Sequence, residues 1–281
     1  MTRPQSCEGM PRGNARDQDP PKYPEEPERK RDAGAMSAVR PCAEPPPGHF
    51  DAMNVRGRLW TAHDARLAYR LLQAVVQLLF RLLTRVQISG LENMPAAGPL
   101  IVAPNHLSVL DTMLIFAIAH RRMTAFAADK WRRGPIGWVL TNIGQTIYVQ
   151  RGVVDRRALG QAMAALAAGA ALGVAPEGTR SRNGGLQEGK NGVAYLASRT
   201  GATILPVALW GQETTWRSWA RFHRPLIHMC IGAPLRLPAT AGSAGSAELA
   251  AYTQEVMLAL ACMLPAEYRG VYAGLCCQAV E

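Results

Sequence analysis

Short apolar runs alternate with longer amphipathic stretches between residues 99 and 264. A short apolar run predicts a buried strand, whereas apolar residues three or four positions apart predict a helix. The predicted strands are 100–103, 124–128, 146–150, 172–175, 204–209 and 226–231. The predicted helices are 108–119, one that begins near Pro135, 155–169, 190–199 and 246–264. This alternation favours an α/β fold, with a mainly parallel or mixed central sheet flanked by helices.

Residues 64–86 have a different pattern, in which an apolar stripe at helical spacing lies opposite a stripe of arginine and glutamine. The apolar stripe consists of Leu67, Leu71, Leu72, Val75, Leu78, Leu79, Leu82 and Leu83. The segment predicts one amphipathic helix. Two interpretations are open: the apolar stripe packs on the rest of the protein, or the helix lies in a membrane interface with its arginines at lipid phosphates.

Proline and charge dominate the first 50 residues, which contain half of the chain's 20 prolines. Such a segment buries too little apolar surface to offset the entropy of ordering. We therefore expect a disordered leader over residues 1–55, an amphipathic membrane-association segment over 56–90 and a main domain over 91–275. The chain has no run of 18 uncharged apolar residues, so no transmembrane helix is expected.

The net charge of +10 comes from the residues after the leader, because acidic and basic residues balance within the first 50. A basic surface of this kind can face nucleic acid, an anionic membrane or a phosphorylated substrate. Residues 216–221 alternate tryptophan with arginine and predict a surface that touches a membrane, whereas we interpret Trp138 as a core residue. The six cysteines lack Cys-x-x-Cys spacing, which indicates reduced thiols and no zinc site.

Candidate site residues directly follow three of the predicted strands. His106 follows strand 100–103, Arg151 follows strand 146–150, and Glu177 follows strand 172–175. The carboxyl ends of parallel strands lie at one edge of a sheet, and ligands bind in the crevice outside that edge. We therefore expect these three residues to converge in space.

The first candidate site consists of Asn105, His106 and Asp111. In one interpretation Asp111 only stabilises a helix start, because Ser108 and Asp111 have the spacing of a capping box. In the other, the Asp111 carboxylate bonds one ring nitrogen of His106. That bond would fix the tautomer and make the other nitrogen a general base for a hydroxyl.

The second candidate site is the sequence Glu177-Gly178-Thr179-Arg180. Glycine permits close approach of the backbone, arginine binds a phosphate through two N–H groups, and a carboxylate accepts a hydrogen bond from a substrate hydroxyl. An exposed charged loop is the alternative interpretation. Further candidate phosphate ligands are Arg151, Lys130 and Lys190.

With these residues the chain resembles the bacterial phospholipid-synthesis acyltransferases, the PlsC-like 1-acyl-glycerol-3-phosphate acyltransferase family. Residues 105–111 resemble the first motif of that family, 143–151 the second, 177–180 the third and 204–208 the fourth. Gly144 departs from the second motif, because it lies one residue further from Arg151 than is usual. The resemblance covers about residues 65–275, including the tail 264–272.

The resemblance implies transfer of an acyl group from acyl-CoA or acyl-carrier protein to the free hydroxyl of a lysophosphatidate, with no metal and no bound cofactor. His106 would be the general base, and Asp111 would orient it. The oxyanion of the tetrahedral intermediate also needs donors, for which the backbone N–H groups near Ser108 are candidates.

The resemblance also implies a binding site for the acceptor and a location. Arg151 and Arg180 would hold the acceptor phosphate, and the remaining substrate-binding residues would be Asn105, Glu177, Gly178 and Thr179. Membrane lipids would be partners and nucleic acid would not. The protein would attach to the cytoplasmic side of the cell membrane as a peripheral or monotopic protein, which fits the helix at 64–86.

Three alternatives remain. The acceptor is glycerol-3-phosphate, a lysophospholipid or an amino-lipid; or the same histidine and aspartate activate water in a hydrolase; or the chain is a basic membrane- or nucleic-acid-binding protein without chemistry. Only the last predicts that His106→Ala leaves the function intact.

Overall fold

The computed structural model describes residues 62–150, 155–238 and 244–275, with side chains from residue 66 onward. All of these belong to one compact unit, Pro45–Glu281. The predicted leader and the candidate ligand Arg151 lie outside the described residues.

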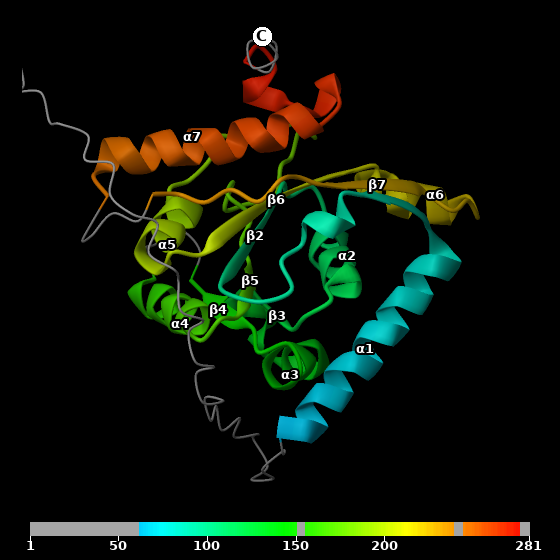
Figure 1. The fold of residues 1–281 in the computed structure, drawn as a ribbon. Coiled ribbons are helices and arrows are strands. Elements are labelled where there is room, and N and C mark those ends of the chain that lie inside the picture. Colours follow the sequence, from blue (N-terminus) through cyan, green and yellow to red (C-terminus); the bar gives the residue numbers. More distant parts are fainter. Residues whose placement is uncertain (1–61, 151–154, 239–243, 276–281) are drawn as a thin grey trace, which may run out of the picture. The chain divides into compact units, whose positions relative to one another are not determined.

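Strands and helices alternate along the described part of the chain, as expected (Figure 1). The strands are β1 (Arg85–Ser89), β2 (Leu100–Pro104), β3 (Met123–Ala128), β4 (Ile147–Val149), β5 (Ala171–Gly173), β6 (Thr203–Trp210) and β7 (Leu226–Ile231). The α-helices are α1 (Ala62–Leu83), α2 (Leu110–Ile118), α3 (Gly134–Asn142), α4 (Arg156–Ala167), α5 (Gly192–Thr200), α6 (Thr215–Ala220) and α7 (Ser246–Met263). Short 3-10 helices are η1 (Leu91–Asn93), η2 (Asp129–Arg132), η3 (Gln212–Thr214), η4 (Ala266–Tyr268) and η5 (Gly270–Tyr272).

Among the described residues the strands form one seven-stranded sheet in the order β1-β7-β6-β2-β5-β3-β4. Neighbouring strands are parallel except β6 and β7, which are antiparallel. The expected α/β fold with a mainly parallel, mixed sheet is therefore confirmed. The two strands at its centre, β2 and β5, are those that lead to His106 and Glu177.

Both faces of the sheet are covered, and β2 shows how the sequence achieves this. Leu100 and Val102 point into a core cluster that includes residues of α2, whereas Ile101 and Ala103 point into a second cluster with residues of α4 and α5. All four side chains are buried. Since successive side chains of a strand face opposite sides, a continuous apolar run is what a doubly covered strand requires.

β1 was not expected, because residues 85 and 86 were assigned to the preceding helix. The helix ends at Leu83, and Thr84 bonds back to the carbonyl oxygen of Phe80 through its backbone N–H and its hydroxyl. Arg85 then donates to the carbonyl oxygen of Pro225, which starts the parallel pairing of β1 with β7. The alternating sequence of β1 suits an edge strand, and this partner 140 residues away cannot be read from local periodicity.

Other boundaries differ by a few residues. α2 begins at Leu110 rather than at Ser108, and Trp138 in α3 is exposed rather than part of the core. The expected cap of α4 is confirmed, because Asp155 Oδ1 accepts from the backbone N–H of Ala158 at 3.0 Å.

The glutamines of α1 face the protein, whereas most of its apolar stripe is exposed. Gln73 Nε2 donates to the carbonyl oxygens of Phe116 and Ala119 at 2.8 Å, and Gln77 Nε2 donates to that of Ala117 at 2.6 Å. These carbonyl groups lie at the end of α2, where they lack partners within the helix. Seven of the apolar residues in the stripe are instead between 43% and 60% exposed. The described helices include none that is long and apolar enough to cross a membrane.

Candidate active site

Asn105 fixes the point at which the chain leaves the sheet. Its side chain is buried, with Oδ1 accepting from the backbone N–H of Leu209 at 2.7 Å and Nδ2 donating to the carbonyl oxygen of Leu209 at 2.8 Å. These two bonds continue the ladder between β2 and β6 by one position beyond Pro104. Asn105 therefore sets the position of the next residue, His106. A direct contact between Asn105 and substrate stays a prediction.

His106 and Asp111 form a hydrogen-bonded pair, as one interpretation of the sequence required. His106 Nδ1 lies 2.8 Å from Asp111 Oδ2. The carboxylate is 1% exposed and the imidazole 19% exposed. With Asp111 ionised, Nδ1 carries the proton and donates it, so Nε2 has its lone pair free to accept. Within the described part of the chain no protein group bonds Nε2.

The Asp111 carboxylate also organises the backbone around the histidine. Its Oδ2 accepts from the backbone N–H groups of Leu107 and Ser108, both at 2.8 Å, and its Oδ1 accepts from Gln212 Nε2 at 2.9 Å. The bond from Ser108 is half of a capping box, and the bond to His106 Nδ1 is the contact that the catalytic interpretation required. A catalytic role for Asp111 stays a prediction. The expectation that N–H groups near Ser108 bind an oxyanion is wrong for Leu107 and Ser108, because both groups already bond Asp111.

Glu177 joins the second candidate site to the first. Its Oε1 accepts from the backbone N–H of His106 at 2.8 Å, and its Oε2 accepts from the backbone N–H of Gln187 at 3.0 Å. Burial raises the pKa of the Glu177 carboxyl, and these two backbone bonds partly oppose that rise. A carboxylate that is 1% exposed and accepts two backbone bonds holds the histidine loop in place. Acceptance of a substrate hydroxyl by Glu177 stays a prediction.

The rest of the second site lies around a tight turn. Gly178 has a φ of +67°, and a side chain there would meet the Lys190 side chain at 3.0 Å. The Lys190 stem therefore passes directly over Gly178. Thr179 and Arg180 are exposed on this turn. The backbone N–H of Ser181 donates to the carbonyl oxygen of His106 at 2.8 Å, so the turn and the loop that carries His106 are bonded on both sides of Thr179 and Arg180.

The expected convergence is therefore observed for His106 and Glu177, whose loops share two hydrogen bonds. It is untested for Arg151. No group of three or more His, Cys, Asp or Glu side chains suited to a metal ion occurs among the residues described.

The C-terminal segment holds the loop that supplies Gln187. The backbone N–H of Leu186 donates to the carbonyl oxygen of Tyr268 at 2.9 Å, and the backbone N–H of Gly189 donates to the Tyr272 hydroxyl at 3.1 Å. Gly270 has a φ of +53°, and a side chain there would lie 2.0 Å from the carbonyl oxygen of Leu186. Only a glycine lets the two segments cross this closely.

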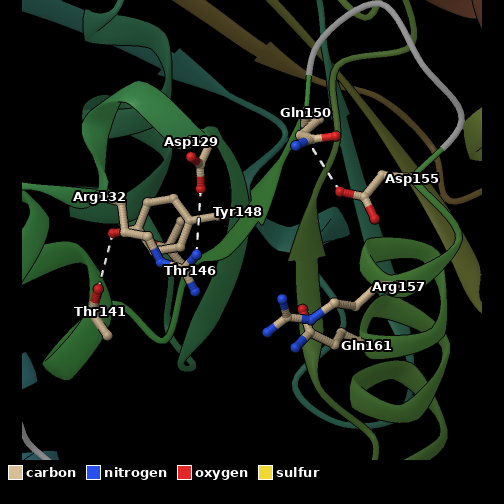
Figure 2. A pocket seen from close by; sticks show the side chains of 9 residues that line it. All are labelled: Asp129, Arg132, Thr141, Thr146, Tyr148, Gln150, Asp155, Arg157 and Gln161. Atoms are coloured by element: carbon tan, nitrogen blue, oxygen red, sulfur yellow. Dashed lines mark hydrogen bonds and ion pairs between the residues drawn. The ribbon is translucent and has the colours of Figure 1, made fainter.

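A polar hollow of about 420 Å³ lies where β3 and β4 end, beside the start of α4 (Figure 2). Its lining includes Arg132 and Arg157 as well as Asp129 and Asp155. Asp155 Oδ2 accepts from the backbone N–H of Gln150 at 3.3 Å, so this acid serves the local backbone. None of the predicted site residues that the structure describes lines the hollow, and β5 and β3 separate β4 from β2 in the sheet.

Gln212 is the residue at the site that sequence reasoning missed. It is 1% exposed, lies in η3 directly after β6, and supplies the side-chain donor to Asp111. No motif marks it, because glutamine is common and its partner lies 101 residues away. The available signal was its position, since β6 neighbours β2 and both strands end at the same edge.

The part of the chain from β1 to β6 is similar to a known protein family. Residues 85–210 match the model of the Acyltransferase family. Over 148 residues the chain is 26% identical to a 1-acyl-sn-glycerol-3-phosphate acyltransferase of Borreliella burgdorferi, covering 52% of this chain and 59% of that protein. Over 132 residues it is 30% identical to a chloroplastic 1-acyl-sn-glycerol-3-phosphate acyltransferase of Arabidopsis thaliana, covering 45% of this chain and 36% of that protein. The chain thus spans less than two thirds of the length of these curated relatives.

A solved structure shares the fold. The crystal structure of the 1-acyl-sn-glycerophosphate acyltransferase PlsC from Thermotoga maritima superposes with a TM-score of 0.55 at 26% sequence identity. The match covers 69% of this chain and 78% of that one. The mixed sheet flanked by helices is therefore an arrangement that a lipid acyltransferase also adopts.

Proposed function

We propose, because residues 85–210 match the model of the Acyltransferase family, that this chain moves a fatty acyl group from a thioester donor to the free hydroxyl of 1-acyl-glycerol-3-phosphate. The product is phosphatidate, and the protein acts in phospholipid synthesis. The donor is acyl-CoA or acyl-carrier protein. The observation that carries the proposal is the hydrogen bond of 2.8 Å between His106 Nδ1 and a buried Asp111 carboxylate.

The pair has the chemistry that acyl transfer to a hydroxyl requires. The acceptor hydroxyl gives its proton to His106 Nε2 while its oxygen attacks the thioester carbonyl carbon. The carbon–sulfur bond then breaks, and the departing thiolate takes the proton back from Nε2. Asp111 keeps Nδ1 as the donor and stabilises the imidazolium that forms between the two steps. No nucleophile on the protein is needed, because the substrate supplies the hydroxyl.

Basic side chains near the catalytic loop support an acceptor that carries a phosphate. Arg180 is exposed on the turn that bonds His106, and Lys190 lies over Gly178 in the same turn. In the proposal Arg180 and Arg151 hold the acceptor phosphate, with Gly178 and Thr179 beside it. A guanidinium suits this task because it binds phosphate oxygens through two parallel N–H groups.

We also include attachment to the membrane surface through the exposed apolar stripe of α1 in this proposal. Apolar side chains that point away from the protein while glutamines point toward it favour the interfacial interpretation of the helix over simple packing. Both the acceptor and the product are membrane lipids, so such attachment would bring the site to its substrate. The proposed location is the cytoplasmic side of the cell membrane.

Phosphatidate formation from acyl-CoA and lysophosphatidate tests the function. We expect turnover by the wild type and a decrease of about 10²–10⁴-fold for His106→Ala, since a general base is lost. His120→Ala, which changes an exposed histidine outside the site, is the matched control and keeps wild-type activity. Equal rates for wild type and His106→Ala would refute the mechanism.

Two further arms of the assay separate the alternatives. Glycerol-3-phosphate or a lysophospholipid in place of lysophosphatidate tests the acceptor, and the preferred acceptor is the one with the highest kcat/KM. Release of free fatty acid at the same rate with and without acceptor would identify a hydrolase instead.

A further inference from the structure

Aromatic and basic side chains gather on the segment that joins β6 to β7. α6 and the four residues after it contain Trp216, Trp219 and Phe222. Trp216 is 66% exposed and Phe222 is 100% exposed. An aromatic side chain wholly in water contributes nothing to the core, although its burial elsewhere would be favourable. The exposure of these residues therefore indicates a surface that binds something outside the described part of the chain.

The backbone of Phe222 strengthens this argument. Its φ is +55°, in the left-handed region that bulky residues rarely adopt. A glycine or asparagine would take this conformation with less strain, so a phenylalanine here is unfavourable for folding. Such strained positions are typical of sites with a role other than stability.

The segment adjoins the end of α1 (Figure 1). Trp219 Nε1 donates to the carbonyl oxygen of Leu83 at 2.9 Å, and the Arg224 guanidinium donates to the carbonyl oxygens of Arg81 and Thr84. The Trp216 ring packs edge-on against Trp219, with 5.2 Å between centroids. Leu83 is the last residue of the exposed apolar stripe of α1, so the stripe ends beside Trp219.

The charged side chains along these two segments are all basic. Residues 65–91 and 214–247 contain no aspartate or glutamate and four arginines each. Arg217 and Arg221 in the second stretch are exposed. A second copy of the chain would bring the same positive charges together, which disfavours self-association through this face. Exposed apolar side chains with arginines beside them in the sequence instead complement the acyl chains and anionic headgroups of a membrane.

We propose that α6 and residues 221–224 form, together with the apolar stripe of α1, one docking face for an anionic lipid surface. Trp216 and Phe222 insert among the acyl chains, while Arg217 and Arg221 lie at the lipid phosphates. This inference rests on the attachment proposed above for α1, but it assigns a second contact from a distant part of the sequence. Two contacts restrict the orientation of the protein on the membrane more than α1 alone does.

Vesicle co-sedimentation of the full-length protein tests the docking face, with vesicles of phosphatidylglycerol or of phosphatidylcholine. Trp216→Ala/Phe222→Gly lowers the partition coefficient by roughly 100-fold on phosphatidylglycerol, because two inserted aromatic groups are lost. Arg217→Gln/Arg221→Gln lowers it by roughly 25-fold on the anionic vesicles and leaves binding to phosphatidylcholine unchanged, as expected for about fivefold per arginine.

Val271→Ala/Leu275→Ala is the matched control, because it removes two exposed apolar side chains from the C-terminal segment. It binds like the wild type, and an equal loss in this control would overturn the proposal. Wild-type binding by Trp216→Ala/Phe222→Gly would overturn it as well. A third result would also overturn the proposal: the wild type is a dimer, and Trp216→Ala/Phe222→Gly is a monomer that binds vesicles as the wild type does. The face would then join two copies of the chain.

Folding and catalysis are checked separately. Because Phe222→Gly relieves backbone strain, the thermal midpoint of Trp216→Ala/Phe222→Gly should not fall. With lysophosphatidate dispersed in detergent micelles, the variant keeps the wild-type rate of acyl transfer. If the wild type itself transfers no acyl group, the proposed activity fails, while the vesicle measurements still decide the docking face.

Discussion

The Asp111 carboxylate accepts four hydrogen bonds, and Gln212 gives the only one to its Oδ1 among the described residues. The other three donors, from residues 106–108, all reach Oδ2. The bond from Gln212 therefore opposes rotation of the Asp111 carboxylate about its Cβ–Cγ bond. Because the imidazole follows the carboxylate, Gln212 should act on catalysis through Asp111 rather than by touching substrate.

Gln212→Met keeps the length of the side chain and removes the donor. We expect kcat to fall about tenfold with little change in KM, because one bond to a charged group is lost. Thr215→Val is the control, since it removes a buried hydroxyl that has no hydrogen-bond partner in the described structure. Its kcat should match the wild type. A common loss in both variants, or a loss in KM alone, would contradict a positioning role for Gln212.

The raised pKa of Glu177 predicts a pH-dependent difference in stability. Because the folded-state pKa lies above the ordinary value of 4.5, the native state binds the proton more tightly than the unfolded state. The contribution of Glu177 to the free energy of unfolding is therefore fully present below pH 4.5 and is lost as the pH rises through the folded-state pKa. Glu177→Gln lacks this decrease, so its free energy of unfolding relative to wild type should rise with pH.

Urea unfolding of both proteins at a series of pH values measures this difference. A constant difference across the series would show that Glu177 has the same pKa in the folded and unfolded states. If the free energy of unfolding of Glu177→Gln relative to wild type instead falls with pH, the folded-state pKa of Glu177 lies below 4.5. The backbone hydrogen bonds would then outweigh the effect of burial.

At the scale of residues, the sequence predicted the pair of His106 and Asp111 but not the groups that hold this pair in place. His106 and Asp111 were recognisable because their spacing and their place after a strand restrict what they can do. Gln212 and the backbone N–H of Gln187 were not, because their role depends on partners that only the folded chain brings near. Glu177 was expected to face substrate, since nothing in the sequence shows that two backbone groups occupy its oxygens.

At the scale of elements, α1 is held to α2 by Gln73, Gln77 and the buried Tyr69 ring, which packs on Phe116, rather than by its exposed leucines. Gln73→Ala/Gln77→Ala removes the three bonds to the final carbonyl groups of α2. We expect the free energy of unfolding to fall by about 2 kcal/mol, at roughly 1 kcal/mol for each glutamine. Alanine favours helices more than glutamine does, so helix propensity would not cause the loss.

Limited proteolysis near residue 84 and urea unfolding together test this contact. Gln161→Ala is the control, because it makes the same change on an exposed position of α4. Stability of Gln73→Ala/Gln77→Ala equal to that of the control would mean that the glutamines do not hold α1 in place.

Element types were largely predictable and pairings were not. Apolar runs and helical spacing located six of the strands because a strand covered on both faces is apolar along its length. The start of β1 was assigned to the preceding helix, because its partner strand β7 lies far away in the sequence. The reversed direction of β7 also leaves no mark on periodicity, because parallel and antiparallel strands alternate their side chains alike.

At the scale of the whole molecule, the C-terminal segment supports the active site through the loop at 185–189. Gly270→Ala places a Cβ 2.0 Å from the carbonyl oxygen of Leu186 and forces the segments apart. We expect a loss of about 2 kcal/mol in the free energy of unfolding and a lower kcat, since Gln187 then bonds Glu177 less well. Gly274→Ala, where a Cβ meets nothing within 4 Å, should behave like the wild type. A destabilised Gly270→Ala with normal kcat would show that the tail serves stability alone.

The bonds between Asn105 and Leu209 make the active-site loop observable without substrate. The backbone N–H of Leu209 lies within β6 and donates to the side chain of Asn105, which directly precedes His106, and not to a strand backbone. Its exchange with deuterium therefore reports whether the loop is docked on the sheet, while the neighbouring amides of β6 report on the sheet itself. Faster exchange at Leu209 alone would identify a loop that opens while the fold stays intact. One amide thus separates local opening of the loop from global unfolding in any variant of this protein.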